Sequence, residues 1–173
     1  MIKLNSLNGF GGGGGGPADP TTWQQVGNEL VIAGIGEPNI CALSATRIAF
    51  MDRSNDDLRT YDWDGTDWAQ VGNDLNFSVT GIPAICKLTS STIAFIDHGN
   101  KDLRTYSFDG TNWSQVGNDL VVSGTGSPQL TRLSDTTIAF IDEGQDDLRK
   151  YTFDGTNWSQ VGNDLNLASI GEP

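Results

Sequence analysis

The sequence predicts an all-β fold made of repeated four-stranded units. Tryptophan recurs every 45 residues, at Trp23, Trp68, Trp113 and Trp158. The segment Asp109–Leu120 is repeated without change at Asp154–Leu165. Each unit is rich in Gly, Asn, Asp, Thr and β-branched residues, and no window has the apolar spacing of an amphipathic helix. A period of about 40–50 residues with four strands in each unit is typical of the blades of a β-propeller.

The second unit illustrates the expected strands, which are Pro83–Leu88, Thr92–Asp97, Leu103–Phe108 and Trp113–Leu120. An Asp-Gly pair opens the connection from the third strand to the fourth, and this pair supplies the positive φ angles of a tight hairpin. The second strand, TIAFID, is apolar on both faces. We therefore expect each sheet to be packed between two neighbouring sheets.

Extended along the chain, this pattern gives an N-terminal tail at 1–22 and repeats over 23–173. Complete blades are expected at about 38–77, 83–122 and 128–167, with partial strands at 23–32 and 168–173. Three blades do not close a ring, because propellers typically have about four to eight. We expect the ring to be completed by oligomerisation or by additional chain beyond Pro173, and an open array is the remaining alternative.

The tail at 1–22 contains six consecutive glycines, Gly11–Gly16. One interpretation is a flexible tether, because glycine has large backbone freedom. The other is an anchor that packs into an assembly, with Met1–Phe10 as the docking peptide. Other copies of this chain, or other assembly proteins, are then the expected partners of residues 1–22. Met1–Phe10 lacks the basic start and apolar stretch of a secretory signal, so no signal peptide is expected.

Each unit also repeats the pattern Asp-Leu-Arg-x-Tyr, and sugar or carboxylate sites use such residues, the arginine for bidentate hydrogen bonds and the ring for stacking. With the repeated tryptophans, the candidate ligand-binding residues are Arg59, Tyr61, Arg104, Tyr106, Arg149, Tyr151, Trp68, Trp113 and Trp158. The structural alternative pairs each arginine with an aspartate on the adjacent strand: Arg59 with Asp52, Arg104 with Asp97, and Arg149 with Asp142. The aromatic side chains would then pack between blades.

The sequence contains none of the common catalytic or metal-binding motifs. It has no G-x-S-x-G, no phosphate-binding loop and no H-E-x-x-H, and His98 is the only histidine. We expect a non-enzymatic protein without cofactors. Val-Gly-Asn-Asp-Leu at 71–75 has too few spaced oxygens for Ca²⁺, so we expect a turn or bulge there and no metal site. Cys41 and Cys86 occupy the same repeat position and are expected to be free thiols.

The formal net charge of −12 argues against nucleic acid and anionic membrane surfaces as partners. No apolar run reaches the roughly 20 residues of a membrane helix, so membrane insertion is not expected. A neutral cell-surface glycan, a cation or a basic protein surface remains as a candidate partner.

The hairpin Asp109–Trp113 resembles the Asp-box of sialidase-type propellers, although here Asp and Gly are adjacent where the box separates them by one residue. In families that carry it, the box is a folding element. By its unit length and its Trp, Asp-Gly and Tyr positions, the region 23–173 resembles repeat propellers of the lectin and virion-spike kind, including the tachylectin and fungal fucose-lectin families. The resemblance implies sugar sites between adjacent blades, at the Arg and Tyr or Trp positions.

Two functions are consistent with these observations. The first is a structural attachment protein, a phage tail-fibre or spike component, which is anchored by its tail and displays the propeller for surface or receptor binding. Its expected location is a virion or extracellular assembly. The alternative is a free-standing multivalent lectin whose similar units bind a carbohydrate with avidity.

Overall fold

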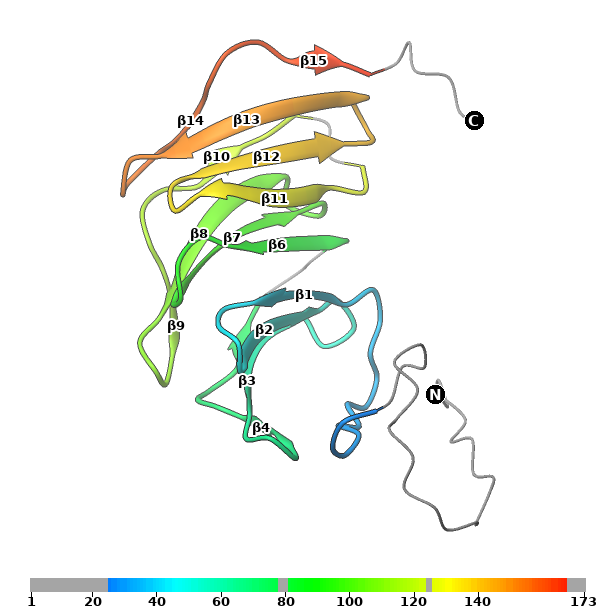
Figure 1. Cartoon of the computed structure of the whole chain (residues 1–173). Coiled ribbons are helices and arrows are strands. Elements are labelled where there is room, and N and C mark those ends of the chain that lie inside the picture. Colours follow the sequence, from blue (N-terminus) through cyan, green and yellow to red (C-terminus); the bar gives the residue numbers. More distant parts are fainter. Residues whose placement is uncertain (1–24, 78–80, 124–125, 168–173) are drawn as a thin grey trace, which may run out of the picture.

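The structure, a computed structural model, describes residues 25–77, 81–123 and 126–167, and within these ranges it consists of three antiparallel sheets without a helix (Figure 1). The first sheet contains β1 (Asn39–Ala42), β2 (Arg47–Asp52), β3 (Asp57–Trp63), β4 (Trp68–Gln70) and β5 (Leu75–Asn76). The second contains β6 (Pro83–Lys87), β7 (Thr92–Asp97), β8 (Asp102–Phe108), β9 (Trp113–Gln115) and β10 (Leu120–Val121). The third contains β11 (Gln129–Ser134), β12 (Thr137–Asp142), β13 (Asp147–Phe153), β14 (Trp158–Gln160) and β15 (Leu165–Asn166). The predicted all-β fold of repeated blades is confirmed.

The fourth strand of each blade differs from the prediction, because it is broken into two short pieces. In the second blade, β9 and β10 both pair with β8, one near each end of that strand. Gly117 lies in the gap with a φ of 74°, a left-handed conformation that a β-strand does not accommodate. The Val116 N–H still donates to the Thr105 carbonyl at 2.9 Å. The outer strand is therefore bent around a turn.

The predicted Asp-Gly hairpin joins the third and fourth strands, but only its glycine, and not the aspartate, has a positive φ. In the second blade, Asp109 Oδ1 accepts the N–H groups of Thr111 at 2.8 Å and Asn112 at 2.7 Å. Gly110 adopts a φ of 103°. The carboxylate closes the turn over its own backbone, which explains why aspartate is placed there.

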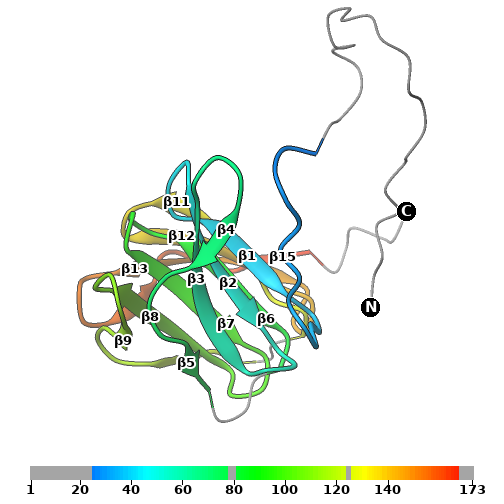
Figure 2. The same cartoon turned by 90° about the horizontal axis from the view of Figure 1, so that it is seen from below.

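The sheets stack in chain order, with β1, β6 and β11 next to one another (Figures 1 and 2). We call the side of a blade that faces the next blade along the chain its forward face, and the opposite side its rear face. Two apolar cores fill the two interfaces. The first joins Leu43, Ala49, Met51 and Leu58 to Ile85, Ile93, Phe95, Tyr106, Phe108 and Trp113. The second joins Ala84, Cys86, Leu88, Ala94, Ile96, Leu103 and Val122 to Ile138, Phe140, Tyr151, Phe153 and Trp158. The prediction that a central strand is buried on both faces is confirmed.

A second contact, which we call the clasp, joins consecutive blades at their outer ends. It is the Val-Gly-Asn turn of one repeat docked on the Asp-Gly hairpin of the next. The Asn73 N–H donates to the Thr111 carbonyl at 2.7 Å, and its Nδ2 donates to Asn112 Oδ1 at 2.9 Å. A Cβ on Gly72 would lie 2.3 Å from the same Thr111 oxygen, so only glycine permits this approach. The predicted turn at 71–75 is therefore also a connector between blades.

The predicted partial strand at 23–32 is wrong for its described part, because residues 25–32 form no strand. In each blade the fourth strand pairs with the third strand of the same blade. Residues 25–32 have no third strand to pair with, because no strand precedes residue 39 in the described part of the chain. The segment instead provides a clasp. The Asn28 N–H donates to the Thr66 carbonyl at 2.9 Å, and its Nδ2 donates to Asp67 Oδ1 at 2.7 Å. The tail at 1–22 and the partial strand at 168–173 lie outside the described residues.

The three blades do not close a ring, since the forward face of the third blade has no neighbour among the described residues (Figure 1). Across residues 25–77, 81–123 and 126–167, no helix is long and apolar enough to span a membrane.

Candidate binding site between the blades

A pocket of about 230 Å³ lies where the outer edge of the second blade meets the rear face of the third. It is lined by Leu120, Val121, Val122 and Ser123 from the second blade and by Arg149, Tyr151, Gln160 and Asp164 from the third. One wall is thus an apolar strand edge and the other is a polar cluster. The register places Arg149 and Tyr151 on the same side of β13, because alternate residues of a strand share a face.

Arg149 is the centre of the polar cluster and is 6% exposed. Its Nε and Nη2 donate to Asp147 Oδ2 at 3.0 and 2.6 Å, and its Nη1 donates to the Ser123 carbonyl at 3.4 Å. Asp164 Oδ2 lies 3.4 Å from the Arg149 Nε. Burial alone lowers the pKa of the arginine, but the hydrogen bonds to Asp147 and Tyr151 outweigh burial and raise that pKa above its ordinary value.

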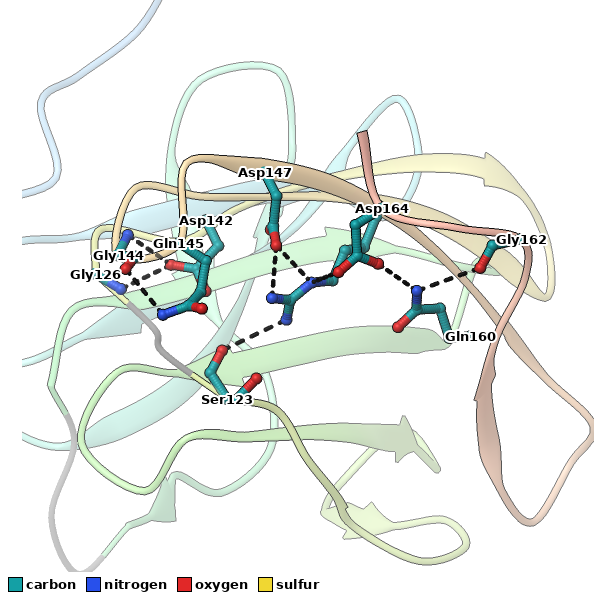
Figure 3. Close-up of polar contacts among 10 residues, drawn as sticks. Ser123, Gly126, Asp142, Gly144, Gln145, Asp147, Gln160, Gly162 and Asp164 are labelled. Atoms are coloured by element: carbon teal, nitrogen blue, oxygen red, sulfur yellow. Dashed lines mark hydrogen bonds and ion pairs between the residues drawn. The ribbon is translucent and has the colours of Figure 1, made fainter. Parts of the chain in front are cut away.

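The carboxylates around Arg149 outnumber its single positive charge. Asp164 is 43% exposed at its side chain and also accepts a hydrogen bond from the Gln160 amide (Figure 3). Burial raises the pKa of the neighbouring Tyr151 hydroxyl, although Arg149 opposes this shift, so the phenol stays protonated at neutral pH. One arginine and two carboxylates sum to −1, which disfavours an anionic ligand at this pocket.

The same cluster occurs in the other two blades. Arg104 Nη2 donates to Asp102 Oδ2 at 2.7 Å, and its Nε donates to Asp119 Oδ2 at 3.3 Å. In the first blade, Arg59 is paired with Asp57, and with Asp74 at 3.4 Å. Tyr61 and Tyr106 are buried beside these arginines, like Tyr151 in the third blade. The structure therefore brings together the arginine and tyrosine of each predicted set.

The predicted pairing of Arg59 with Asp52 and of Arg149 with Asp142 is wrong, and the side chain of Asp97 lies outside the described part of the chain. Each arginine pairs with the aspartate two residues before it on its own strand and with the aspartate of its own Val-Gly-Asn-Asp turn. The strand register is the reason, since Arg59 lies opposite Phe50, while Asp52 lies opposite Asp57. Arg149 likewise lies opposite Phe140.

Asp52 and Asp142 have a different role, which the sequence did not reveal. Asp142 Oδ1 accepts the N–H groups of Gly126 at 2.9 Å and Gly144 at 2.8 Å (Figure 3). Asp52 Oδ1 accepts the N–H groups of Gly36 and Ser54, both at 3.0 Å. These carboxylates fix the loop after the second strand to the connector that enters the blade.

The predicted tryptophans are not at the pocket. Trp113 and Trp158 are 5% and 4% exposed, and their indole N–H groups donate to Thr60 Oγ1 and Thr105 Oγ1, each at 2.9 Å. They bridge consecutive blades through the apolar cores, as the structural alternative proposed. Trp68 is half-buried against Trp63, with ring centroids 5.4 Å apart.

Sequence reasoning missed three contributors to the pocket: Gln160, Asp164 and the apolar edge at 120–123. A signal existed for the first two, since Gln and Asp recur in every Trp-x-Gln-Val-Gly-Asn-Asp segment. Nothing local marked the apolar edge, which belongs to a different blade.

The described part of the chain offers neither a cluster of metal ligands nor a reactive thiol. No group of three or more His, Cys, Asp or Glu residues there could hold a metal ion. Cys41 and Cys86 are free, as predicted, and burial raises the pKa of each thiol to about 12. Both cysteines are therefore protonated and unreactive at neutral pH.

No protein-family model and no curated protein matches this sequence. Among solved structures, the chain is similar to Hsv2 of Kluyveromyces lactis, at 12% identity and a TM-score of 0.52 over 70% of this chain and 44% of that one. It is also similar to the Aleuria aurantia lectin in complex with Fucα1-6GlcNAc, at 15% identity and a TM-score of 0.51 over 81% of this chain and 48% of that one. The similar regions span less than half the length of either structure, and they confirm the propeller-like fold.

Proposed function

We propose that this chain is a carbohydrate-binding protein whose sites lie between consecutive blades, and that it acts by binding rather than by catalysis. The observation that carries this proposal is the pocket around Arg149, which joins a polar cluster to an apolar strand edge. A sugar presents the same two chemistries, hydroxyl groups at its rim and C–H groups on its faces.

The polar cluster suits a neutral hydroxylated ligand. Gln160 and Asp164 are exposed at the pocket wall and offer amide and carboxylate groups to ligand hydroxyls. Val121 is 77% exposed and provides an apolar surface for the C–H face of a ring. The pocket is smaller than the roughly 300–1,000 Å³ of sites for drug-sized ligands, so it matches a single sugar residue.

Repetition of the cluster adds a second line of support. Arg104 and Arg149 each have the same two carboxylates and face a preceding blade, and two weak sites on one rigid array bind a branched or clustered glycan with avidity. The similar lectin of Aleuria aurantia is solved with a fucosyl disaccharide, which makes fucosylated glycans the first ligands to test.

The virion attachment role depends on residues 1–22, which lie outside the described residues, and it stays a prediction. The proposed sugar binding is compatible with it, because an attachment protein also needs a surface ligand.

The test is a glycan array followed by titration calorimetry with the best ligand, using Fucα1-6GlcNAc as the starting probe. Substituting Asp164→Asn together with Gln160→Ala removes exposed ligand-facing groups and leaves the buried Arg149 in place. We expect the double variant to lose one binding site per chain while the remaining sites keep their affinity.

The matched control is Ser159→Ala, which changes an exposed residue next to Gln160 on β14 that does not line the pocket. It should retain the stoichiometry of the unmodified chain. Absence of any glycan binding would contradict the proposed function, and unchanged stoichiometry in the double variant would place the sugar elsewhere.

A further inference from the structure

The forward face of the third blade is an exposed apolar surface. It carries Leu133, Ile141, Val161 and Leu165, whose side chains are 55%, 45%, 40% and 57% exposed. Gly162, in the clasp turn of this blade, has no atom within 4 Å of the position a Cβ would occupy. This face keeps several apolar residues of the internal forward faces, although Gln129 and Thr131 replace Ala84 and Cys86, and no blade covers it among the described residues.

The same positions in the other blades show what such a face binds. Leu43 and Leu88, which correspond to Leu133, are 0% and 1% exposed. Met51 and Ile96, which correspond to Ile141, are both fully buried. In both cases the cover is the rear face of another blade. A rear face of this repeat is therefore the surface that fits the open forward face.

The first blade has the only rear face that another blade does not cover in the described ranges. Its Ile40 is 59% exposed, whereas the corresponding Ile85 of the second blade is 5% exposed. The segment 25–37 covers this face loosely, because Val26 and Val31 are 73% and 83% exposed. The N-terminal part of the segment is held by the clasp of Asn28 on the hairpin of the first blade, and its C-terminal end is held by Asp52, which accepts the Gly36 N–H.

Each open face carries a charged residue where the internal faces have an uncharged one. The charge is positive on the forward face of the third blade and negative on the hairpin of the first blade. On the forward face, the exposed Lys150 replaces the buried Thr60 and Thr105. On the hairpin of the first blade, Asp67 replaces Asn112 and Asn157. The positive charge appears on one open face and the negative charge on the other, so the two faces attract each other.

We propose that a second copy of this chain docks head to tail, with the rear face of its first blade on the forward face of the third blade. Asn163 of one copy then takes the place of Asn28 on the hairpin of the second copy. Residues 25–32 of the loose segment are displaced by a whole blade face, which buries more apolar surface, while Gly36 keeps its bond to Asp52.

A head-to-tail contact generates a ring if its rotation closes. In this association Leu165 and Leu167 of one copy come to lie beside Arg59 and Tyr61 of the other, which completes a further pocket of the kind described above.

Sedimentation velocity across a concentration series tests the proposal directly. We expect the chain to associate reversibly, and we expect Leu133→Glu and Ile40→Glu each to weaken self-association by at least about 30-fold, because each puts a carboxylate into the apolar contact. Both residues are exposed in the single chain, so circular dichroism should show that both variants stay folded. The control Val121→Glu alters an exposed apolar residue that lies on neither of the two open faces, and this variant should associate like the unmodified chain.

Mixing the two variants distinguishes this arrangement from any symmetric contact. Leu133→Glu retains an intact rear face and Ile40→Glu retains an intact forward face, so the mixture should form dimers although each variant alone is monomeric. A chain that stays monomeric at millimolar concentration would overturn the proposal. Association that survives both substitutions, or a mixture that stays monomeric, would overturn the assignment of these faces.

Discussion

The forward faces of the second and third blades share most of their apolar positions, but only the forward face of the second blade is buried. Val116 and Leu120 belong to a segment that recurs unchanged as 154–165, yet Val161 and Leu165 are more exposed than their counterparts. Because this segment is the same in both blades, the difference in exposure comes from the neighbour. Burial in this fold is thus a property of a pair of blades, and equal residues contribute unequally to stability.

The largest expected contrast is between Leu88 and Leu133. Replacing the buried Leu88 by alanine leaves a cavity between blades and should lower the free energy of unfolding by about 2–5 kcal/mol. Leu133→Ala should change it by less than about 0.5 kcal/mol, because that side chain is exposed. Urea denaturation at a concentration where the chain is monomeric measures both, and equal losses would show that the open face is covered within the single chain.

The clasp glycines give the next contrast. Gly117 and Gly162 both have positive φ, 74° and 78°, so alanine should cost each of them about 1–2 kcal/mol in backbone strain. At Gly117 the new Cβ would also lie 2.2 Å from the Thr156 carbonyl oxygen of the next blade. We expect Gly117→Ala to be less stable than Gly162→Ala by about 1–3 kcal/mol in thermal and urea unfolding. Similar stabilities would mean that the clasp is loose in solution.

The smallest contrast concerns Thr105 and Lys150, which occupy the same repeat position. Thr105→Val removes the acceptor of the buried Trp158 indole N–H and should cost about 1–2 kcal/mol. Lys150→Val removes an exposed side chain, and we expect a change within about 0.5 kcal/mol. The Trp158→Phe variant provides the check, since in that background Thr105→Val should lose most of its effect. A full effect in the double variant would show that Thr105 acts through packing alone.

Much of the fold could be predicted from the sequence because its signals are local or periodic. The 45-residue spacing of Trp23, Trp68, Trp113 and Trp158 identified the repeat, and alternation within each unit located the first three strands. The break in the fourth strand was missed. Its cause is the approach of the next hairpin to Gly72 and Gly117, which involves a second blade.

The candidate site was predicted in part. The Asp-Leu-Arg-x-Tyr pattern predicted Arg149 and Tyr151 as candidate ligand-binding residues, and the structure places both at a pocket. The carboxylate partners were assigned to the wrong strand, because only the register shows that Arg149 lies opposite Phe140 and beside Asp147. The apolar wall at 120–123 could not be found, since it comes from the preceding blade.

By itself, the sequence determined the repeat, the strands within each unit and the Asp-Gly hairpins, since a turn closed by its own aspartate needs no partner from elsewhere in the chain. Only the tertiary structure decided which copies of a repeated residue are buried. It also decided which arginine contacts which carboxylate and where two blades enclose a pocket. The physical reason is that identical segments fold identically but meet different neighbours, and apolar burial and hydrogen-bond pairing between blades depend on the neighbour.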